Sequence, residues 1–223
     1  MLPIFLQSFT VTAFTCRPSL AANIPSTEMN ALHDFYNSTN GDEWQWRPMR
    51  GAHWNFKTTA NPCVDDWQGV NCTYDSLADI YHISGISLER YNLSGVLPAS
   101  IKHLPSLVTL SLPDNSIGGS IPPEITQLGL LKKMWLSVNK LNSSIPQDIG
   151  QLSNLTSLDL SNNEFSGSIP DSIGSLSRLE ELTFVHNHLA GRIPDTIGQL
   201  GNLRTLLLDD NKLTGQLPPS IGN

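Results

Sequence analysis

The stretch SNLTSLDLSNNEFSGSIPDSIGSL, residues 153–176, decides the fold because it recurs at a fixed spacing along most of the chain. Residues 105–128 read PSLVTLSLPDNSIGGSIPPEITQL, and residues 177–200 read SRLEELTFVHNHLAGRIPDTIGQL. Written from Tyr81 in rows of 24, the chain gives five complete rows without insertion or deletion, and a sixth that stops one residue short at Asn223. Such a period indicates a solenoid in which each row forms one turn.

The columns of these rows have separate structural tasks. Positions 3, 6 and 8 are apolar in every row, as in Leu155, Leu158 and Leu160, and their alternation with polar residues predicts a short strand. One strand cannot bury that face alone, so stacked turns should share a continuous core with their strands in a parallel sheet. Proline fills position 18 in all six rows, which places it on the return segment because it cannot donate a hydrogen bond.

Position 11 forms a polar column. It holds Asn115, Asn139, Asn163, Asn187 and Asn211, and only the first row departs, with Tyr91. An inward asparagine can bond backbone groups where the chain leaves the strand, and such groups cost about 1–3 kcal/mol each when buried without a partner. The first row adjoins a segment that does not repeat, where atypical repeats are expected.

Residues 22–80 do not repeat, and we expect them to form an N-terminal cap on the first turn. The apolar side chains at helical spacing, after possible start signals at Pro25 and Ser26, are those of Met29, Leu32, Phe35 and Tyr36. Four of the five tryptophans fall in this segment: Trp44, Trp46, Trp54 and Trp67. We expect them to cover the apolar end of the first row; a sugar-binding aromatic platform is the alternative.

The N-terminus and the cysteines indicate an extracellular protein. Residues 1–21 contain a short apolar stretch and small residues suited to cleavage after Ala21, which predicts a signal peptide. Cys16 would leave with it, so Cys63 and Cys72 remain as a pair that should form a disulfide in an oxidising compartment. Zinc is the rival explanation, but two cysteines without nearby histidines cannot make a four-ligand site.

Five N-x-S/T sequons fit the same compartment. They are headed by Asn37, Asn71, Asn92, Asn142 and Asn154, and each is an expected site of N-glycosylation. The formal net charge of −7 argues against nucleic acid as a partner, because phosphate binding requires a basic surface. The sequence contains no apolar run of about 18 residues, so we predict no transmembrane helix in it.

The sequence contains no recognisable catalytic arrangement. G-x-S-x-G, H-E-x-x-H, P-loop and kinase motifs are absent, so we expect no enzyme activity and no cofactor. Kinase activity is expected only if a longer chain continues beyond Asn223. Asp159-x-Ser161-x-Asn163 weakly resembles a calcium loop but lacks the required glycine and terminal glutamate, so no metal is expected either. His186 and His188 are expected to be solvated; a metal-binding or pH-sensing role is the alternative.

The candidate site is therefore a surface, formed by residues at positions 5, 7, 9, 10 and 12 that should point outward on the concave side of the sheet. The residues proposed to bind a ligand there are Arg90, Asp114, Trp135, Val138, Asp159, Glu164, Val185, His186, His188, Asp209 and Asp210. Trp135 stands where neither core nor cap needs an aromatic residue, and tryptophan is frequent at binding hot spots. We centre the patch on Trp135, Asp159, His186 and Asp209; a merely solvated face is the alternative.

These rows resemble the plant-type leucine-rich repeat, LxxLxLxxNxLxGxIPxxIGxL, over residues 81–223. The cap signature PC-x-W-x-G-V-x-C is matched by Pro62, Cys63, Trp67, Gly69, Val70 and Cys72. The segment ALHDFYNSTNGDEW is also similar to caps of secreted repeat proteins from protists and algae. The resemblance implies an α/β solenoid: a right-handed superhelix with a parallel β-sheet on the concave face and 3-10 or irregular segments on the convex face.

The resemblance implies an extracellular module that binds a protein or peptide, either a receptor-like ectodomain or a secreted inhibitor similar to polygalacturonase-inhibiting proteins. A co-receptor or a second copy is a further possible partner. No cap follows the sixth row, so we expect a fragment or an ectodomain, attached to a membrane only through a segment after Asn223. A structural matrix or ice-binding solenoid is the second class. The mixed residues at position 7, from Ser87 to Trp135 and Leu207, favour an irregular partner over ice.

Overall fold

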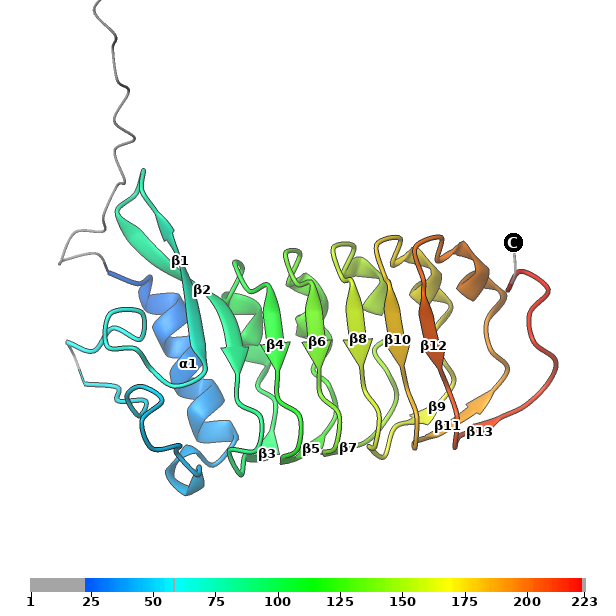
Figure 1. Cartoon of the computed structure of the whole chain (residues 1–223), viewed down its shortest axis with the longest axis horizontal. Coiled ribbons are helices and arrows are strands. Elements are labelled where there is room, and N and C mark those ends of the chain that lie inside the picture. Colours follow the sequence, from blue (N-terminus) through cyan, green and yellow to red (C-terminus); the bar gives the residue numbers. More distant parts are fainter. Residues whose placement is uncertain (1–22, 58, 222–223) are drawn as a thin grey trace, which may run out of the picture.

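The computed structural model describes residues 23–57 and 59–221 and shows stacked turns with a helical cap at their N-terminal end (Figure 1). The predicted signal peptide lies outside the described residues. Each turn contributes one strand to a long sheet: β2 (Ile80–Ser87), β4 (Thr109–Ser111), β6 (Lys133–Trp135), β8 (Ser157–Asp159), β10 (Glu181–Thr183) and β12 (Thr205–Leu207). These strands pair in parallel, and the register joins residues 24 positions apart, as in Leu110 with Met134. The pairing confirms the repeat and the predicted parallel sheet.

One strand of the long sheet comes from the cap. Strand β1 (Val70–Asp75) pairs antiparallel with β2 and forms the outer edge of the sheet, so the sheet of the described residues has seven strands. The hairpin of β1 and β2 extends beyond the repeats in Figure 1. The repeat pattern could not predict this strand, because β1 lies in the part of the chain that does not repeat.

A second row of short strands follows the long sheet in each turn. These strands form two three-stranded groups, β3 (Ser94–Val96), β5 (Ser116–Gly119) and β7 (Lys140–Leu141), then β9 (Ser166–Gly167), β11 (His188–Gly191) and β13 (Lys212–Leu213). The chain returns through the 3-10 helices η2 (Ala99–His103), η3 (Pro123–Gln127), η4 (Ile149–Gln151), η5 (Asp171–Ser175) and η6 (Asp195–Gln199). The column of prolines directly precedes most of these helices, where a fixed φ and a missing N–H are tolerated.

The asparagine column joins neighbouring turns as predicted. Asn163 accepts a hydrogen bond from the N–H of Leu141 in the preceding turn (3.0 Å). Its side-chain amide donates to the carbonyl of Leu136 in that turn (2.9 Å) and to the carbonyl of Leu160 in its own turn (3.1 Å). The other four asparagines make the same bonds. In the first turn, Tyr91 instead donates its hydroxyl to Gln68 of the cap (3.1 Å).

The cap consists of helix α1 (Ser26–Ser38), the short helix η1 (Gly41–Glu43), an aromatic cluster and the loop that carries the disulfide. Leu32 and Phe35 of α1 are buried, and so are Trp44, Trp54 and Trp67. The ring centroids of Trp44 and Trp54 lie 5.0 Å apart in an edge-on arrangement, a favourable geometry for aromatic pairs. These three tryptophans belong to the core, as expected, and present no open platform to a sugar. Trp46, the fourth predicted, is half-buried and stacks on His53, with the ring centroids 4.8 Å apart.

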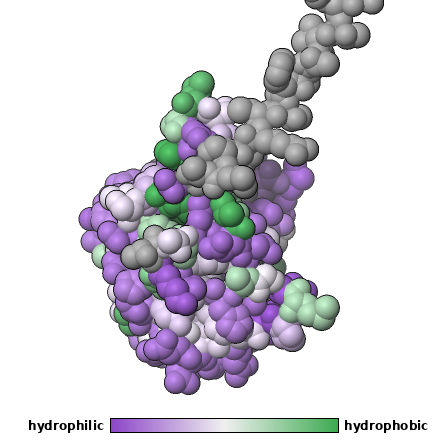
Figure 2. Space-filling view, turned by 90° about the vertical axis from the view of Figure 1, so that its left-hand side faces the viewer, coloured by the Kyte–Doolittle hydropathy of each residue, from purple (hydrophilic) through white to green (hydrophobic). Residues whose placement is uncertain are grey.

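The cap is fixed to the first turn by contacts that the sequence did not reveal. The carboxylate of Glu28, only 2% exposed, accepts a hydrogen bond from the N–H of Ile83 (2.7 Å) and lies 2.6 Å from Nδ1 of His82. The expected disulfide joins Cys63 to Cys72 in strand β1. Figure 2, which views the cap end, shows a mostly hydrophilic surface with separate hydrophobic patches. The cap therefore closes this end of the core.

We predict that Asn163→Ala lowers the free energy of unfolding by about 3 kcal/mol, because it leaves several buried backbone groups without their partner. Chemical denaturation measures the change. Glu164→Ala is the matched control: it truncates the next, exposed side chain and should change stability by less than about 0.5 kcal/mol. Equal effects of the two substitutions would show that the asparagine column does not hold the turns together.

Candidate partner-binding surface

The outward residues at positions 5, 7, 9 and 10 of each turn form one continuous surface on the long sheet, which we call the sheet face. Strands β4, β6, β8, β10 and β12 end at position 7, so positions 9 and 10 lie in the bend that follows each of them. Two of the predicted residues lie farther along the chain. His188 pairs in β11 of the second row of strands, and the N–H of Glu164 donates to the carbonyl of Leu141 in β7 of the same row.

Charged side chains of the first two turns pair with one another. The guanidinium of Arg90 lies 2.8 Å from the carboxylate of Asp114 and 3.6 Å from that of Glu89. Arg90 is 68% exposed, and exposed ion pairs of this kind contribute only about 0–1 kcal/mol. These predicted residues therefore form a paired, solvated group at the cap end of the sheet face.

Trp135 is held in one orientation by a hydrogen-bonded chain across three turns. Its indole N–H donates to Oγ of Ser157 in the next turn (2.8 Å), and that hydroxyl donates to the carboxylate of Glu181 one turn further (2.9 Å). The ammonium of Lys133 lies 4.9 Å from the centre of the indole ring, within the range of a cation–π contact. The half-buried ring is thus a fixed part of the sheet face. The sequence did not predict the role of Ser157. The one indication was that Ser157 stands in the row between those of Trp135 and Glu181.

The remaining predicted residues do not join the Trp135 chain. Asp159 uses its carboxylate locally, accepting from the N–H of Ser161 (3.0 Å) and from the hydroxyl of the same residue. Nδ1 of His186 lies 2.9 Å from the carboxylate of Asp210, and both side chains are more than half exposed. Asp209 is exposed beside them. Within residues 23–57 and 59–221, no group of three His, Cys, Asp or Glu side chains is placed to hold a metal.

Every turn adopts a left-handed backbone conformation at position 10. The residues there, all with φ between 52° and 59°, are Arg90, Asp114, Val138, Asn162, His186 and Asp210. Asparagine and aspartate tolerate this conformation, whereas a β-branched side chain is strained by about 1–2 kcal/mol. Val138 nevertheless occupies this position and is 44% exposed. Complete burial of its side chain therefore does not offset the backbone strain. Strain at an exposed position makes Val138 a candidate functional residue.

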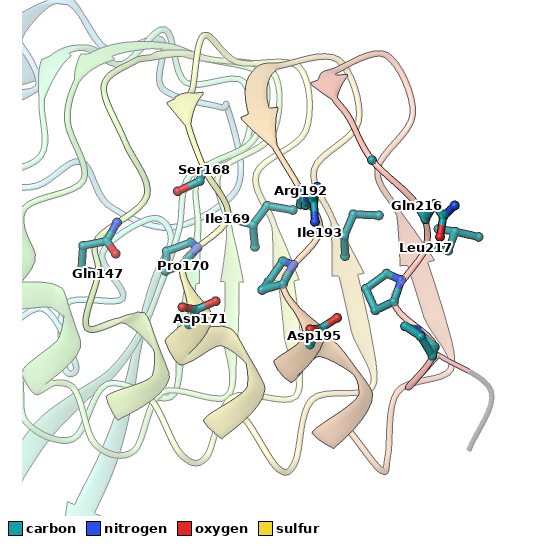
Figure 3. Close-up of a pocket in the computed structure, with 14 residues that line it drawn as sticks. Gln147, Ser168, Ile169, Pro170, Asp171, Arg192, Ile193, Asp195, Gln216 and Leu217 are labelled. Atoms are coloured by element: carbon teal, nitrogen blue, oxygen red, sulfur yellow. The ribbon is translucent and has the colours of Figure 1, made fainter.

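A groove of about 640 Å³ crosses the last three turns, between the second row of strands and helices η5 and η6 (Figure 3). Its lining includes the side chains of Arg192, Asp171 and Asp195. The turns beside it are bridged by hydroxyls at position 20, where Thr196 donates to the carbonyl of Asp171 (2.8 Å). Because these segments recur in each turn, the groove follows from the repeat and not from a specially built site.

Comparison of the sequence and structure with those of known proteins agrees with the repeating architecture described above. The family described as Leucine Rich Repeat matches residues 106–128, 154–176, 178–200 and 202–223. No curated protein matches the sequence. No helix among the described residues has the length and hydrophobicity needed to cross a membrane.

Solved structures of plant proteins share the fold. The leucine-rich-repeat ectodomain of the Arabidopsis thaliana membrane receptor kinase GASSHO1/SCHENGEN3, solved with CASPARIAN STRIP INTEGRITY FACTOR 2, is 29% identical with a TM-score of 0.77. The match covers 87% of this chain but only 22% of that ectodomain. The BIR3–SERK2 complex from Arabidopsis thaliana gives 32% identity and a TM-score of 0.67, covering 83% of this chain and 94% of the other.

A plant ice-binding protein is also similar, with 29% identity and a TM-score of 0.74 over 89% of this chain and 60% of that one. Together with the 24-residue register and the asparagine column, these similarities define the class. The chain belongs to the plant-type leucine-rich-repeat family, whose structural neighbours here include receptor-kinase ectodomains.

We predict that Val138→Asn raises the free energy of unfolding by about 1 kcal/mol, because asparagine relieves the left-handed strain. The reverse exchange one turn later, Asn162→Val, should lower stability by a similar amount, since its φ of 54° is the same. Thermal and chemical denaturation of both variants measure the pair. Destabilisation by Val138→Asn would mean that the valine side chain stabilises the fold and is not kept for another purpose.

Proposed function

We propose that this protein is an extracellular recognition module that binds a protein or peptide through the sheet face of its third to sixth turns. The observation that carries the proposal is the third turn. It presents a tryptophan fixed by a hydrogen-bonded chain and, three residues later, an exposed valine kept in a strained backbone. Neither residue is needed to close the core. A rigid, partly exposed aromatic beside an aliphatic side chain is typical of a binding hot spot.

Charge on the sheet face supports a partner with basic groups. The last three turns present the carboxylates of Asp159, Glu181, Asp209 and Asp210, whereas the third presents Lys133 beside Trp135. Complementary charge increases association rates and excludes partners of the wrong sign. A partner that contacts Trp135 and extends toward the sixth turn would meet a predominantly acidic surface.

The neighbours support a receptor-like role. The GASSHO1/SCHENGEN3 ectodomain was solved in complex with CASPARIAN STRIP INTEGRITY FACTOR 2, and the BIR3–SERK2 structure is itself a complex. By analogy, this chain would be part of a receptor-like ectodomain that binds a ligand and a co-receptor. The disulfide and the five sequons support secretion, with residues 22–80 as the cap and 81–223 as the repeats. A secreted inhibitor of cell-wall hydrolases would use the same surface.

To test this proposal, a partner is first captured from extracellular fluid by chemical cross-linking and then produced in pure form. Its affinity for variants of this protein is then measured. We predict that Trp135→Ala weakens its affinity about 30-fold, the effect of losing a hot-spot contact of about 2 kcal/mol. Gln147→Ala, an exposed change in the same turn away from the sheet face, is the matched control. Unchanged affinity of the Trp135 variant would place the binding site elsewhere.

Ice binding is the second candidate function, favoured by the similarity to the plant ice-binding protein. The small polar residues lie not on the sheet face but in the segment that follows the second row of strands, where position 16 holds Ser120, Ser144 and Ser168 in the second to fourth turns. In the other three turns the same position holds Val96, Arg192 and Gln216. We expect no thermal hysteresis from the purified protein. Hysteresis that Ser144→Tyr abolishes and Trp135→Ala leaves intact would establish ice binding and overturn the recognition function.

A further inference from the structure

One sequon lies at the edge of the long sheet, next to the sheet face. Asn71, which heads the sequon Asn71-Cys72-Thr73, is exposed in strand β1 and stands opposite Gly85 of β2. Gly85 occupies position 5 of the first turn, where a side chain would point outward on the sheet face. A Cβ at Gly85 would lie 3.0 Å from Nδ2 of Asn71 and 3.2 Å from its Cβ. The asparagine side chain therefore lies over the first turn, in the space that the glycine leaves.

The glycine is not required by the backbone. Gly85 is not among the residues with positive φ, so its strand conformation is open to any amino acid. The other five turns have side chains at the same position: Thr109, Lys133, Ser157, Glu181 and Thr205. A side chain at this point of the sheet would press on Asn71 and require it to shift, which favours glycine here.

We propose that Asn71 carries an N-linked glycan that covers the cap end of the sheet face and confines the partner to the third to sixth turns. In the transfer, Nδ2 of Asn71 loses one proton and bonds to C1 of the first N-acetylglucosamine of a lipid-linked oligosaccharide. The bond from C1 to the lipid diphosphate breaks, and the diphosphate leaves with the electron pair. The glycan is bulky and hydrophilic, and from this root it extends over Gly85 and its neighbours.

The other four sequons lie outside positions 5 to 10 of the last four turns. Asn37 lies on helix α1, and Asn142 and Asn154 lie outside positions 5 to 10. Asn92 is in the first turn, and its Nδ2 donates to the carbonyl of Glu43 in the cap (3.0 Å). Strand β6, which carries Trp135, is three strands away from β1, or about 14 Å. The glycan would therefore border the proposed binding surface, and the inference rests on the proposed function for that surface.

The experiment uses the whole chain secreted from plant or insect cells, with glycopeptide mass spectrometry to read occupancy. We expect Asn71 to be glycosylated. Single-cysteine reporters at matched positions then measure coverage: Thr109→Cys in the second turn and Thr205→Cys in the sixth, both half-buried threonines at position 5. A polyethylene glycol maleimide should react with the Thr109→Cys protein about tenfold more slowly than with the same protein after the glycan is removed. The Thr205→Cys protein should react equally in both states.

The glycan is removed in two independent ways, by Thr73→Val, which leaves Asn71 in place, and by enzymatic deglycosylation of the folded protein. Asn37→Gln, which removes a glycan from the cap helix, should leave the labelling of both reporters unchanged. An unmodified Asn71 would overturn the proposal, and so would equal labelling of Thr109→Cys with and without the glycan. Neither result affects the Trp135→Ala test, so failure here and failure of the proposed function are distinguishable.

Discussion

Backbone hydrogen bonds between neighbouring turns are the constraint on which the rest of this structure depends. After each strand the chain bends, and backbone N–H groups of the bend donate to carbonyls of the next turn, as Val138 does to Ser161. In the second to sixth turns one asparagine adds side-chain bonds to backbone groups of the preceding turn. This arrangement holds the turns in a register of 24 residues. The residue at position 10, just before the asparagine column, is left-handed in every turn, and in the third turn it is Val138.

The third turn combines several departures from the repeat. It has valine at the left-handed position, serine in place of the usual glycine at position 15, and the only tryptophan outside the cap. Ser143 also adopts a positive φ of 70°, which costs more for serine than for glycine. The first turn departs in a different way, since Tyr91 and Gly85 both adapt it to the cap. Departures in the first turn thus coincide with contacts to the cap, whereas Trp135 and Val138 are the residues on which the proposed binding function rests.

Much of the fold was predictable because each repeat specifies its own turn through residue types at fixed positions. The apolar columns, the inward asparagines, the prolines before the 3-10 helices and the disulfide all appear in the structure as the sequence predicted. The candidate surface was predictable only as a set of positions. The sequence did not predict which of these residues are in contact. Ser157 links Trp135 to Glu181 through hydrogen bonds between turns, whereas Asp159 forms hydrogen bonds within its own turn.

The sequence by itself determined that equal turns stack, which side chains fill their interior and which point outward, since a period of 24 residues with fixed apolar positions has few ways to bury its core. Only the tertiary structure decided how the cap joins the repeats. The buried carboxylate of Glu28 on Ile83, strand β1 at the sheet edge and Asn71 over Gly85 pair residues from segments that do not repeat. No periodicity encodes such contacts; they depend on the path of the chain through the cap.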